Sequence, residues 1–198
     1  MRRCLACGWV LALVAAGCAT PRTTDTPRTA TEQLLLSAAA DYALPKMDLS
    51  PLAGKKVYLD TANFEGTDKG YVIGAVAGRL NAQGAHIAPS AEKADAVLAL
   101  HCGALSTDRG DFLLGIPVLE VPLPFGGTIK TPELALLKRT HRVGIVKLGG
   151  HAHDTATGEH LLSVGPLDGQ SRYDMWTIML VTFDVSNIPE KGGTPKEH

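Results

Sequence analysis

The segment His151–His160, with the sequence HAHDTATGEH, holds three histidines and two acids within ten residues. Side chains alternate along a strand, so in a β-hairpin His151, His153 and His160 can share one face. Three neutral imidazoles at that spacing suit Zn²⁺ or Cu²⁺, with Asp154 or water as a fourth ligand. The segment therefore raises the hypothesis of a periplasmic metal-binding protein with a histidine-rich hairpin.

The same segment has a second interpretation, which is the solvated tip of a hairpin. Asp154, Thr157 and Gly158 are the residue types that a tight loop requires, since glycine adopts positive φ at no steric cost. Lys147 falls on the same strand face as the histidines, and its charge opposes the binding of a cation. We favour the hairpin tip and keep the metal site as the alternative.

Other patterns with catalytic potential are weaker. His101 and Cys102 are adjacent, so on a strand they point to opposite faces and cannot form a nucleophile–base pair. Cys102 is better explained as a small buried hydrophobic residue, and His101 as a core or interface histidine. The chain contains no Gly-x-Ser-x-Gly elbow, phosphate-binding glycine loop or His-Glu-x-x-His motif. We therefore predict no catalytic residues and no cofactor.

The N-terminus has the features of an export signal. Met1, Arg2 and Arg3 precede about thirteen apolar residues, which is signal-peptide length and too short to span a membrane. The signal ends in LVAAGC, where small residues precede Cys18 as they do in bacterial lipoprotein signals. The sequence thus predicts a signal peptide over residues 1–17 and a lipid on Cys18 that anchors the protein to the membrane, facing the periplasm.

Two further features bear on location and partners. Ala19 follows the predicted lipid anchor in place of the aspartate that retains lipoproteins at the inner membrane of enteric bacteria, which favours the outer membrane. The formal net charge is −1, with no cluster of basic residues, so the chain lacks the surface that nucleic acid binding demands.

The rest of the chain predicts one α+β domain over residues 30–189, between a flexible Thr- and Pro-rich tether (18–29) and a disordered tail (190–198). Thr29 and Glu32 have the spacing of a capping box, which starts a helix. Gly74 and Gly78 in the second helix are placed to allow close packing on the sheet. We expect a single mixed, mostly antiparallel sheet with two helices on one face. The predicted helices are 30–43 and 67–85, and the predicted strands are 55–64, 85–89, 94–105, 139–154, 159–171 and 173–185.

Residues 106–132 interrupt this regular pattern. Three prolines within IPVLEVPLP remove backbone donors, so we expect at best an edge strand or an extended loop there. The segment also carries many apolar side chains, which must be covered by the domain itself, by a partner or by lipid. Its candidate partner-binding residues are Phe112, Leu114, Ile116, Leu119 and Phe125.

Several of these stretches carry a family resemblance. RTATEQLLLSAAADYAL and GIPVLEVPLP look like an uncharacterised family of bacterial lipoproteins. The unit from KKVYLD to AEKADAVLALHCGAL, with the later VKLGGHAHDTATGEHLLS, resembles envelope lipoproteins related to the curli-secretion channel subunit and the flagellar-assembly lipoproteins. This resemblance implies an envelope-assembly or scaffolding role and no catalytic residues. We therefore expect a non-enzymatic, lipid-anchored envelope lipoprotein with a protein partner, and metal binding through His151, His153 and His160 as the alternative.

Overall fold

The computed structural model describes residues 28–179 and 181–188. The predicted signal peptide (1–17), the predicted lipidation site Cys18 and the predicted tail (190–198) lie outside these residues, as does the predicted tether up to residue 27. No helix in the described part of the chain is long and apolar enough to cross a membrane.

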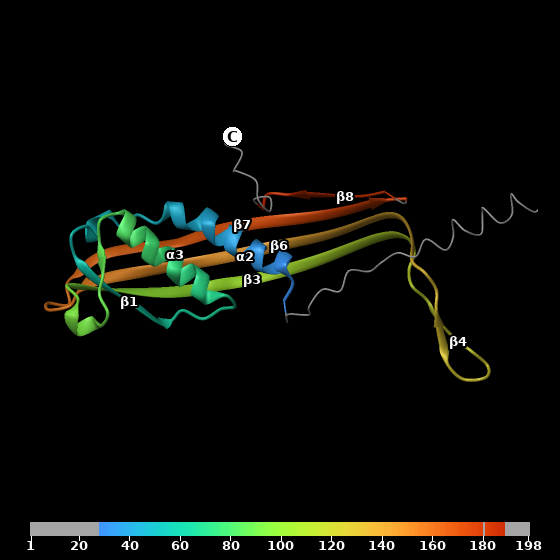
Figure 1. Cartoon of the computed structure of the whole chain (residues 1–198), viewed down its shortest axis with the longest axis horizontal. Helices are drawn as coiled ribbons and strands as arrows, with labels where there is room; N and C mark the ends of the chain where they lie inside the picture. The colour runs from blue at the N-terminus through green and yellow to red at the C-terminus, as the bar shows by residue number, and fades with distance from the viewer. Residues whose placement is uncertain (1–27, 180, 189–198) are drawn as a thin grey trace, which may run out of the picture.

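The described chain forms two α-helices and a large sheet (Figure 1). The helices are α2 (Ala30–Ala43) and α3 (Lys69–Ala82), with three short 3-10 helices, η1 (Leu44–Lys46), η2 (Ser50–Leu52) and η3 (Ala91–Lys93). The strands are β1 (Lys56–Asn63), β2 (His86–Ile87), β3 (Ala96–Ile116), β4 (Glu120–Pro122), β5 (Thr128–Lys130), β6 (Leu134–Asp154), β7 (His160–Ile178) and β8 (Val181–Ser186).

The main sheet has the order β2-β1-β3-β6-β7-β8. Strands β2, β1 and β3 run parallel, and the pairing is antiparallel from β3 to β8. This confirms the predicted mixed, mostly antiparallel sheet with two helices, both of which contribute to one core cluster with the sheet. Strands β3, β6 and β7 extend well beyond α2 and α3, as Figure 1 shows, so neither of the described α-helices lies on the far part of the sheet.

Helix α2 begins where the sequence predicts it. The Thr29 hydroxyl accepts from the Glu32 amide at 3.3 Å, and the Thr29 amide donates to the Glu32 carboxylate at 3.1 Å. This capping box satisfies two amides that the first helical turn leaves without partners. Arg28 also forms an ion pair with Asp68 beside α3. The last two residues of the predicted tether are therefore joined to the domain.

Close packing of α2 on the sheet depends on glycines of the strands. A Cβ on Gly169 of β7 would lie 1.9 Å from the Ala39 carbonyl oxygen, and one on Gly144 of β6 would lie 2.5 Å from the Leu35 carbonyl oxygen. By contrast, a Cβ on Gly74 or Gly78 in α3 would meet nothing within 4 Å. The expectation that these two helical glycines permit close packing is therefore wrong.

The hydrophobic core lies between the helices and one end of the sheet. Its side chains alternate along the strands, as burial of one face requires. The largest fully buried ones are Phe64, Leu35, Leu36, Met47, Leu49, Leu52, Leu80, Leu98, Leu100, Leu148, Val57 and Val72. The core therefore holds together the helix-covered half of the molecule alone.

Two sequence expectations need correction. The predicted strand 94–105 ends too early, because β3 continues to Ile116 as an edge strand and stops where Pro117 would remove a ladder donor. The run 173–185 is not one strand, because Met179 adopts a left-handed φ of 56° and β8 returns antiparallel to β7. The alternation changes phase across this turn, from Trp176 and Ile178 to Val181 and Phe183, but the continuous apolar run Ile178–Val181 hides the change.

Candidate functional site

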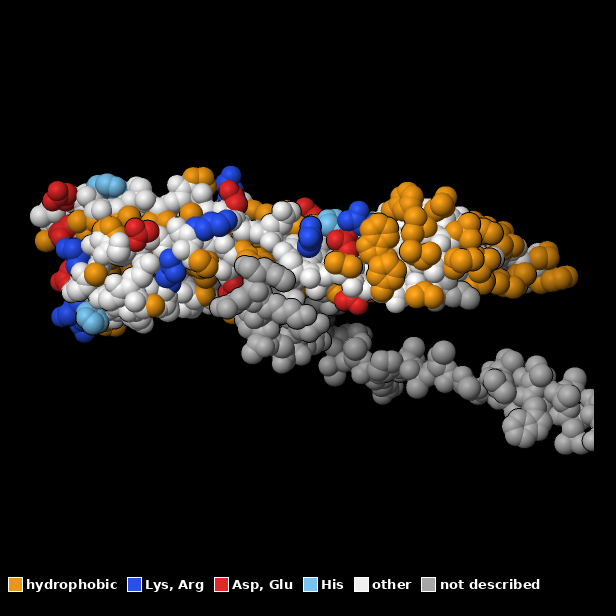
Figure 2. Space-filling model, turned by 90° about the horizontal axis from the view of Figure 1, so that it is seen from above, with side chains coloured by type: hydrophobic (Ala, Val, Ile, Leu, Met, Phe, Trp, Pro, Cys, Tyr) orange, Lys and Arg blue, Asp and Glu red, His pale blue; other side chains and the backbone are white. Residues whose placement is uncertain are grey.

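The part of the sheet that the helices leave uncovered is the most unusual surface of the protein. We call it the distal sheet, which consists of residues 106–116, 134–143, 172–179 and 181–186. The loop 117–133, with the β4–β5 hairpin, extends from its end and is called the tip loop (Figure 1). Figure 2 shows hydrophobic side chains gathered at this end of the molecule. Monomeric soluble proteins seldom expose so continuous an apolar surface.

The candidate partner-binding residues of the sequence all lie in the distal sheet and the tip loop. Phe112, Leu114, Ile116 and Leu119 are each about half exposed, and Phe125 is 100% exposed. The described residues of the domain therefore do not cover these side chains. Fifteen further large apolar side chains are exposed among the described residues, and those in the distal sheet and tip loop are Val118, Val121, Leu123, Ile129, Leu134, Leu136, Met175, Ile178, Met179, Val181, Phe183 and Val185.

The two faces of the distal sheet differ in chemistry. A Cβ on Gly144 would point at α2, so Gly144 marks the helix-facing side of β6. Because side chains alternate along a strand, Thr140 and Arg142 lie on that side and Arg139 and His141 lie on the other. We call the other side the outer face. One row of side chains crosses it in the order Phe112, Arg139, Trp176 and Phe183, and the next row is Leu114, Leu137, Ile178 and Val181. The outer face is thus mainly apolar.

A polar cluster lies within this apolar outer face. The Asp174 carboxylate accepts from Arg139 Nε at 3.0 Å and lies 2.7 Å from His141 Nδ1. Its side chain is 11% exposed. Burial alone would raise the pKa of Asp174, but the hydrogen bonds from His141 and Arg139 outweigh burial and lower the pKa. The cluster therefore keeps a charged carboxylate on an otherwise apolar surface.

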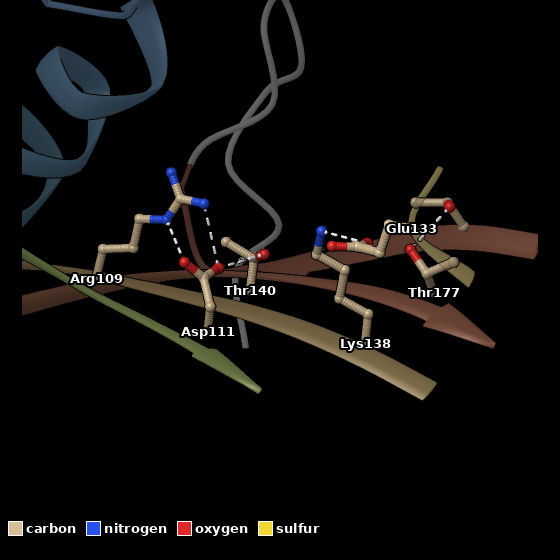
Figure 3. A network of polar contacts seen from close by, with 7 residues as sticks. Arg109, Asp111, Glu133, Lys138, Thr140 and Thr177 are labelled. Atoms are coloured by element: carbon tan, nitrogen blue, oxygen red, sulfur yellow. Dashed lines mark hydrogen bonds and ion pairs between the residues drawn. The ribbon is translucent and has the colours of Figure 1, made fainter. Parts of the chain in front are cut away.

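The helix-facing side of the distal sheet carries both polar and apolar side chains and is hollowed into an open cavity of about 890 Å³. Figure 3 shows its polar contacts. Asp111 accepts from Arg109 Nε at 2.8 Å and from the Thr140 hydroxyl at 2.7 Å, and these bonds lower the pKa of Asp111. Lys138 donates to Glu133 at 2.7 Å. The charged groups drawn there are paired with each other, so they form a structural network and no constellation of acid, base and nucleophile.

The three histidines of the hypothesised metal site, His151, His153 and His160, lie at the end of the sheet opposite to the tip loop. His153 pairs with His160 across the β6–β7 ladder, whereas His151 pairs with Ser163, and the register shifts between residues 152 and 153. Within residues 28–179 and 181–188, no three His, Cys, Asp or Glu side chains are grouped so that they could hold a metal ion. The structure therefore does not assemble the three histidines into the hypothesised Zn²⁺ or Cu²⁺ site.

Asp154, in the same hairpin, stabilises the turn by hydrogen bonds. Its carboxylate accepts from the Ala156 amide at 3.0 Å and from the Thr157 amide at 3.1 Å. The backbone hydrogen bonds lower the pKa of Asp154, and Gly158 adopts a φ of 72°. Both residues thus have the roles that the hairpin interpretation gives them.

Burial and packing explain Cys102 and His101 as structural residues. The Cys102 thiol is half-buried, and burial raises its pKa, which lowers the fraction of reactive thiolate at neutral pH. His101 is exposed on the outer face, and its ring lies over Gly149, where a Cβ would come within 2.7 Å of Nε2. This packing accounts for His101 without any catalytic role.

Sequence reasoning missed the polar cluster of the outer face and the separate strand β8. Arg139, His141 and Asp174 come from two strands and meet only through the register Arg139↔Trp176 and His141↔Asp174. The one available signal was a charged residue, Asp174, within a strongly apolar run. That signal names one member of the cluster and does not identify its partners.

Comparison with known proteins gives a family and no activity. No curated protein and no solved structure matches the chain. The model of a family of unknown function (DUF6655) matches residues 12–192, which is most of the chain. The protein therefore belongs to this family of unknown function.

Proposed function

We propose that this protein is a non-enzymatic, lipid-anchored lipoprotein of the cell envelope that serves as a protein-interaction or assembly module. Its partner is a protein that contacts the distal sheet and the tip loop. The observation that carries this proposal is the set of large apolar side chains that the described domain leaves uncovered there, with Phe125 fully exposed.

The composition of the outer face favours a protein partner. Trp176, Arg139 and Phe183 lie in one row, and Trp and Arg are the residue types that contribute most to protein–protein binding. Burying the fully exposed Phe125 contributes roughly 1.5–3 kcal/mol, and each half-exposed apolar side chain contributes about half as much. A few such residues supply enough free energy for a stable contact.

The anchor is supported by the sequence. LVAAGC places Cys18 after a signal-length apolar segment, and the chain resembles envelope-assembly lipoproteins in its strand and hairpin motifs. Residues 18–28 can span at most about 35 Å when fully extended. An anchor at Cys18 therefore keeps the domain close to the membrane, with the outer membrane favoured by Ala19.

The anchor is tested by replacing Cys18 with serine and separating membranes from soluble envelope contents. We expect the wild-type protein in the membrane fraction and the Cys18→Ser protein in the soluble fraction. Unchanged membrane retention of the variant would contradict the anchor.

The interaction role is tested with a photo-crosslinking amino acid at Phe125 in the full chain. The matched control position is Glu159, which is exposed in the hairpin at the other end of the sheet. We expect adducts with protein at position 125 and none at position 159. Adducts with lipid alone, or equal protein adducts at both positions, would contradict a protein-binding tip.

A further inference from the structure

Among the described residues, strand β8 presents a free edge. It is the last strand of the sheet, and all six of its residues are exposed. The Asn187 amide donates to the Arg172 carbonyl at 3.2 Å, and hydrogen-bonded pairs alternate along an antiparallel ladder. The backbone groups of Thr182, Asp184 and Ser186 therefore point away from β7. Strand β8 contains neither proline nor lysine, the residues that commonly protect such edges.

The distal half of β3 presents a second free edge. Strand β1 pairs with β3 as far as His101, so residues 106–116 have β6 on one side and no other described strand on the second side. The Met179 amide donates to the Leu136 carbonyl, so in this part of β6 the even-numbered residues bond to β7 and the odd-numbered residues bond to β3. The residues of β3 that bond back to β6 are the even-numbered ones, so the backbone groups of Arg109 and Asp111 point outward.

The two edges match in direction and in the chemistry of both faces. From β3 to β8 each strand is antiparallel to the next, so β8 and the β3 of a second copy in the same orientation are also antiparallel. On the outer face, Val181 and Phe183 of one edge meet Phe112 of the other. On the helix-facing side, Asp184 shares the face of Met175, its partner across the ladder, and Arg109 lines the same cavity as Met175.

We propose that β8 of one copy pairs with the distal half of β3 of the next copy, with Asp184 opposite Arg109. In this register the two outward-facing backbones meet and opposite charges stand across from each other, which favours cross-strand pairing. A shift by two residues would place Asp184 opposite Asp111, where two carboxylates repel. Phe183 then lies opposite Gly110, and Val181 lies opposite Phe112.

This inference rests on the proposed interaction role and names a second copy of the chain as the partner. Because the two edges are different, the contact is head-to-tail. Each added copy leaves one free edge, so the contact builds a ring or an open chain with all tip loops at the same end. The lipid anchors, at one per copy, then hold such an assembly to one membrane.

The register is tested by disulfide crosslinking of the full chain in membranes, with Cys102 replaced by serine. One copy carries Gly110→Cys, where a Cβ meets nothing within 4 Å, and the other carries Phe183→Cys. We expect a disulfide-linked dimer when the two variants are co-expressed, and a ladder of larger species when one chain carries both cysteines. Absence of the dimer overturns the proposal.

Two controls sharpen this test. Phe112→Cys paired with Phe183→Cys is displaced by two residues from the proposed register, and equal crosslinking of this pair overturns the register. Phe183→Cys alone should give no dimer, because a dimer of that variant would show pairing between two β8 strands and overturn the head-to-tail contact.

The charge pair is tested by exchange. Arg109→Asp or Asp184→Arg alone should lower the yield of the Gly110–Phe183 crosslink roughly two- to fivefold, and the two together should restore it. Unchanged yield in both single variants overturns the pairing of Arg109 with Asp184. Protein adducts at Phe125 without the Gly110–Phe183 crosslink would support the interaction role and overturn the self-pairing. The crosslink without protein adducts at Phe125 would support the self-pairing and contradict protein binding at the tip loop.

Discussion

Arg139 lies over the indole of Trp176, with its guanidinium carbon 4.9 Å from the ring centroid. The same guanidinium reaches the Asp174 carboxylate, with Nη2 at 2.8 Å from Oδ1. The stack and the ion pair hold one long side chain flat on the outer face. The distal sheet, on which no described helix packs, is thus stabilised by contacts between its own strands.

We predict that Asp174→Asn lowers the free energy of unfolding by roughly 1–3 kcal/mol, because the bonds from Arg139 and His141 lose their charged acceptor. Denaturant unfolding measures this change. Asp168→Asn is the matched control, since Asp168 lies exposed on the same strand, and it should change the free energy of unfolding by less than about 0.5 kcal/mol. Equal effects of the two substitutions would show that the cluster does not stabilise the sheet.

The same cluster predicts a pH dependence. The pKa of Asp174 is lower in the folded protein than in the unfolded chain, so its contribution to stability is full above its ordinary pKa and is lost as the pH falls through the folded value. Asp174→Asn removes this contribution, and the gap in stability between wild type and variant should shrink on acidification below about pH 4. Thermal unfolding across this range measures the gap, and a constant gap would contradict the lowered pKa.

We predict opposite outcomes for alanine at two glycines. Gly169→Ala should destabilise the protein by roughly 1–3 kcal/mol, because the new Cβ collides with the Ala39 carbonyl and forces α2 away from β7. Gly78→Ala should stabilise it by about 0.5–1 kcal/mol, because the position is helical and has open space. If the denaturant midpoints of the two variants moved in the same direction, this would contradict a close contact at Gly169 and open space at Gly78.

Alanine substitutions at two phenylalanines should have separate effects, one on stability and the other on the binding of apolar molecules. Phe64→Ala should cost roughly 3–5 kcal/mol, since Phe64 is 1% exposed in the core. Phe125→Ala should leave the free energy of unfolding unchanged within about 0.5 kcal/mol and reduce binding of an apolar dye to the folded protein. Unfolding and dye fluorescence measured on both variants test this, and a strongly destabilised Phe125→Ala would show that the tip loop packs on the domain.

The Cys102 thiol should react slowly with alkylating reagents at neutral pH. Burial raises its pKa, so the reactive thiolate is scarce in the folded protein. Alkylation should be faster in denaturant, and its rate in the native protein should keep rising above the pH at which an ordinary cysteine reaches its plateau. Mass spectrometry of timed samples measures both rates, and equal rates in native and unfolded protein would contradict a raised pKa.

The sequence predicted features that depend on near neighbours. Helix α2 follows from the capping box of Thr29 and Glu32, and the hairpin at Asp154 follows from its turn residues. Features that depend on the pairing of distant strands were missed or misplaced. The close contact of Gly169 with Ala39, the meeting of Arg139 with Asp174 and the pairing of His151 with Ser163 all depend on register, which local spacing does not determine. The length of β3 was hidden because its distal residues are exposed, so no core favours their alternation.

The position of β6 between β3 and β7 has a consequence for the order of folding. Along the β3–β6 ladder the partners nearest in sequence are Ile116 and Leu134, at the distal end, whereas the β6–β7 ladder is shortest at His153 and His160, at the core end. Closing a short loop costs less chain entropy than closing a long one, so the two hairpins start at opposite ends of β6. The apolar distal hairpin therefore starts to form away from the core, and its large apolar side chains stay exposed among the described residues of the folded protein.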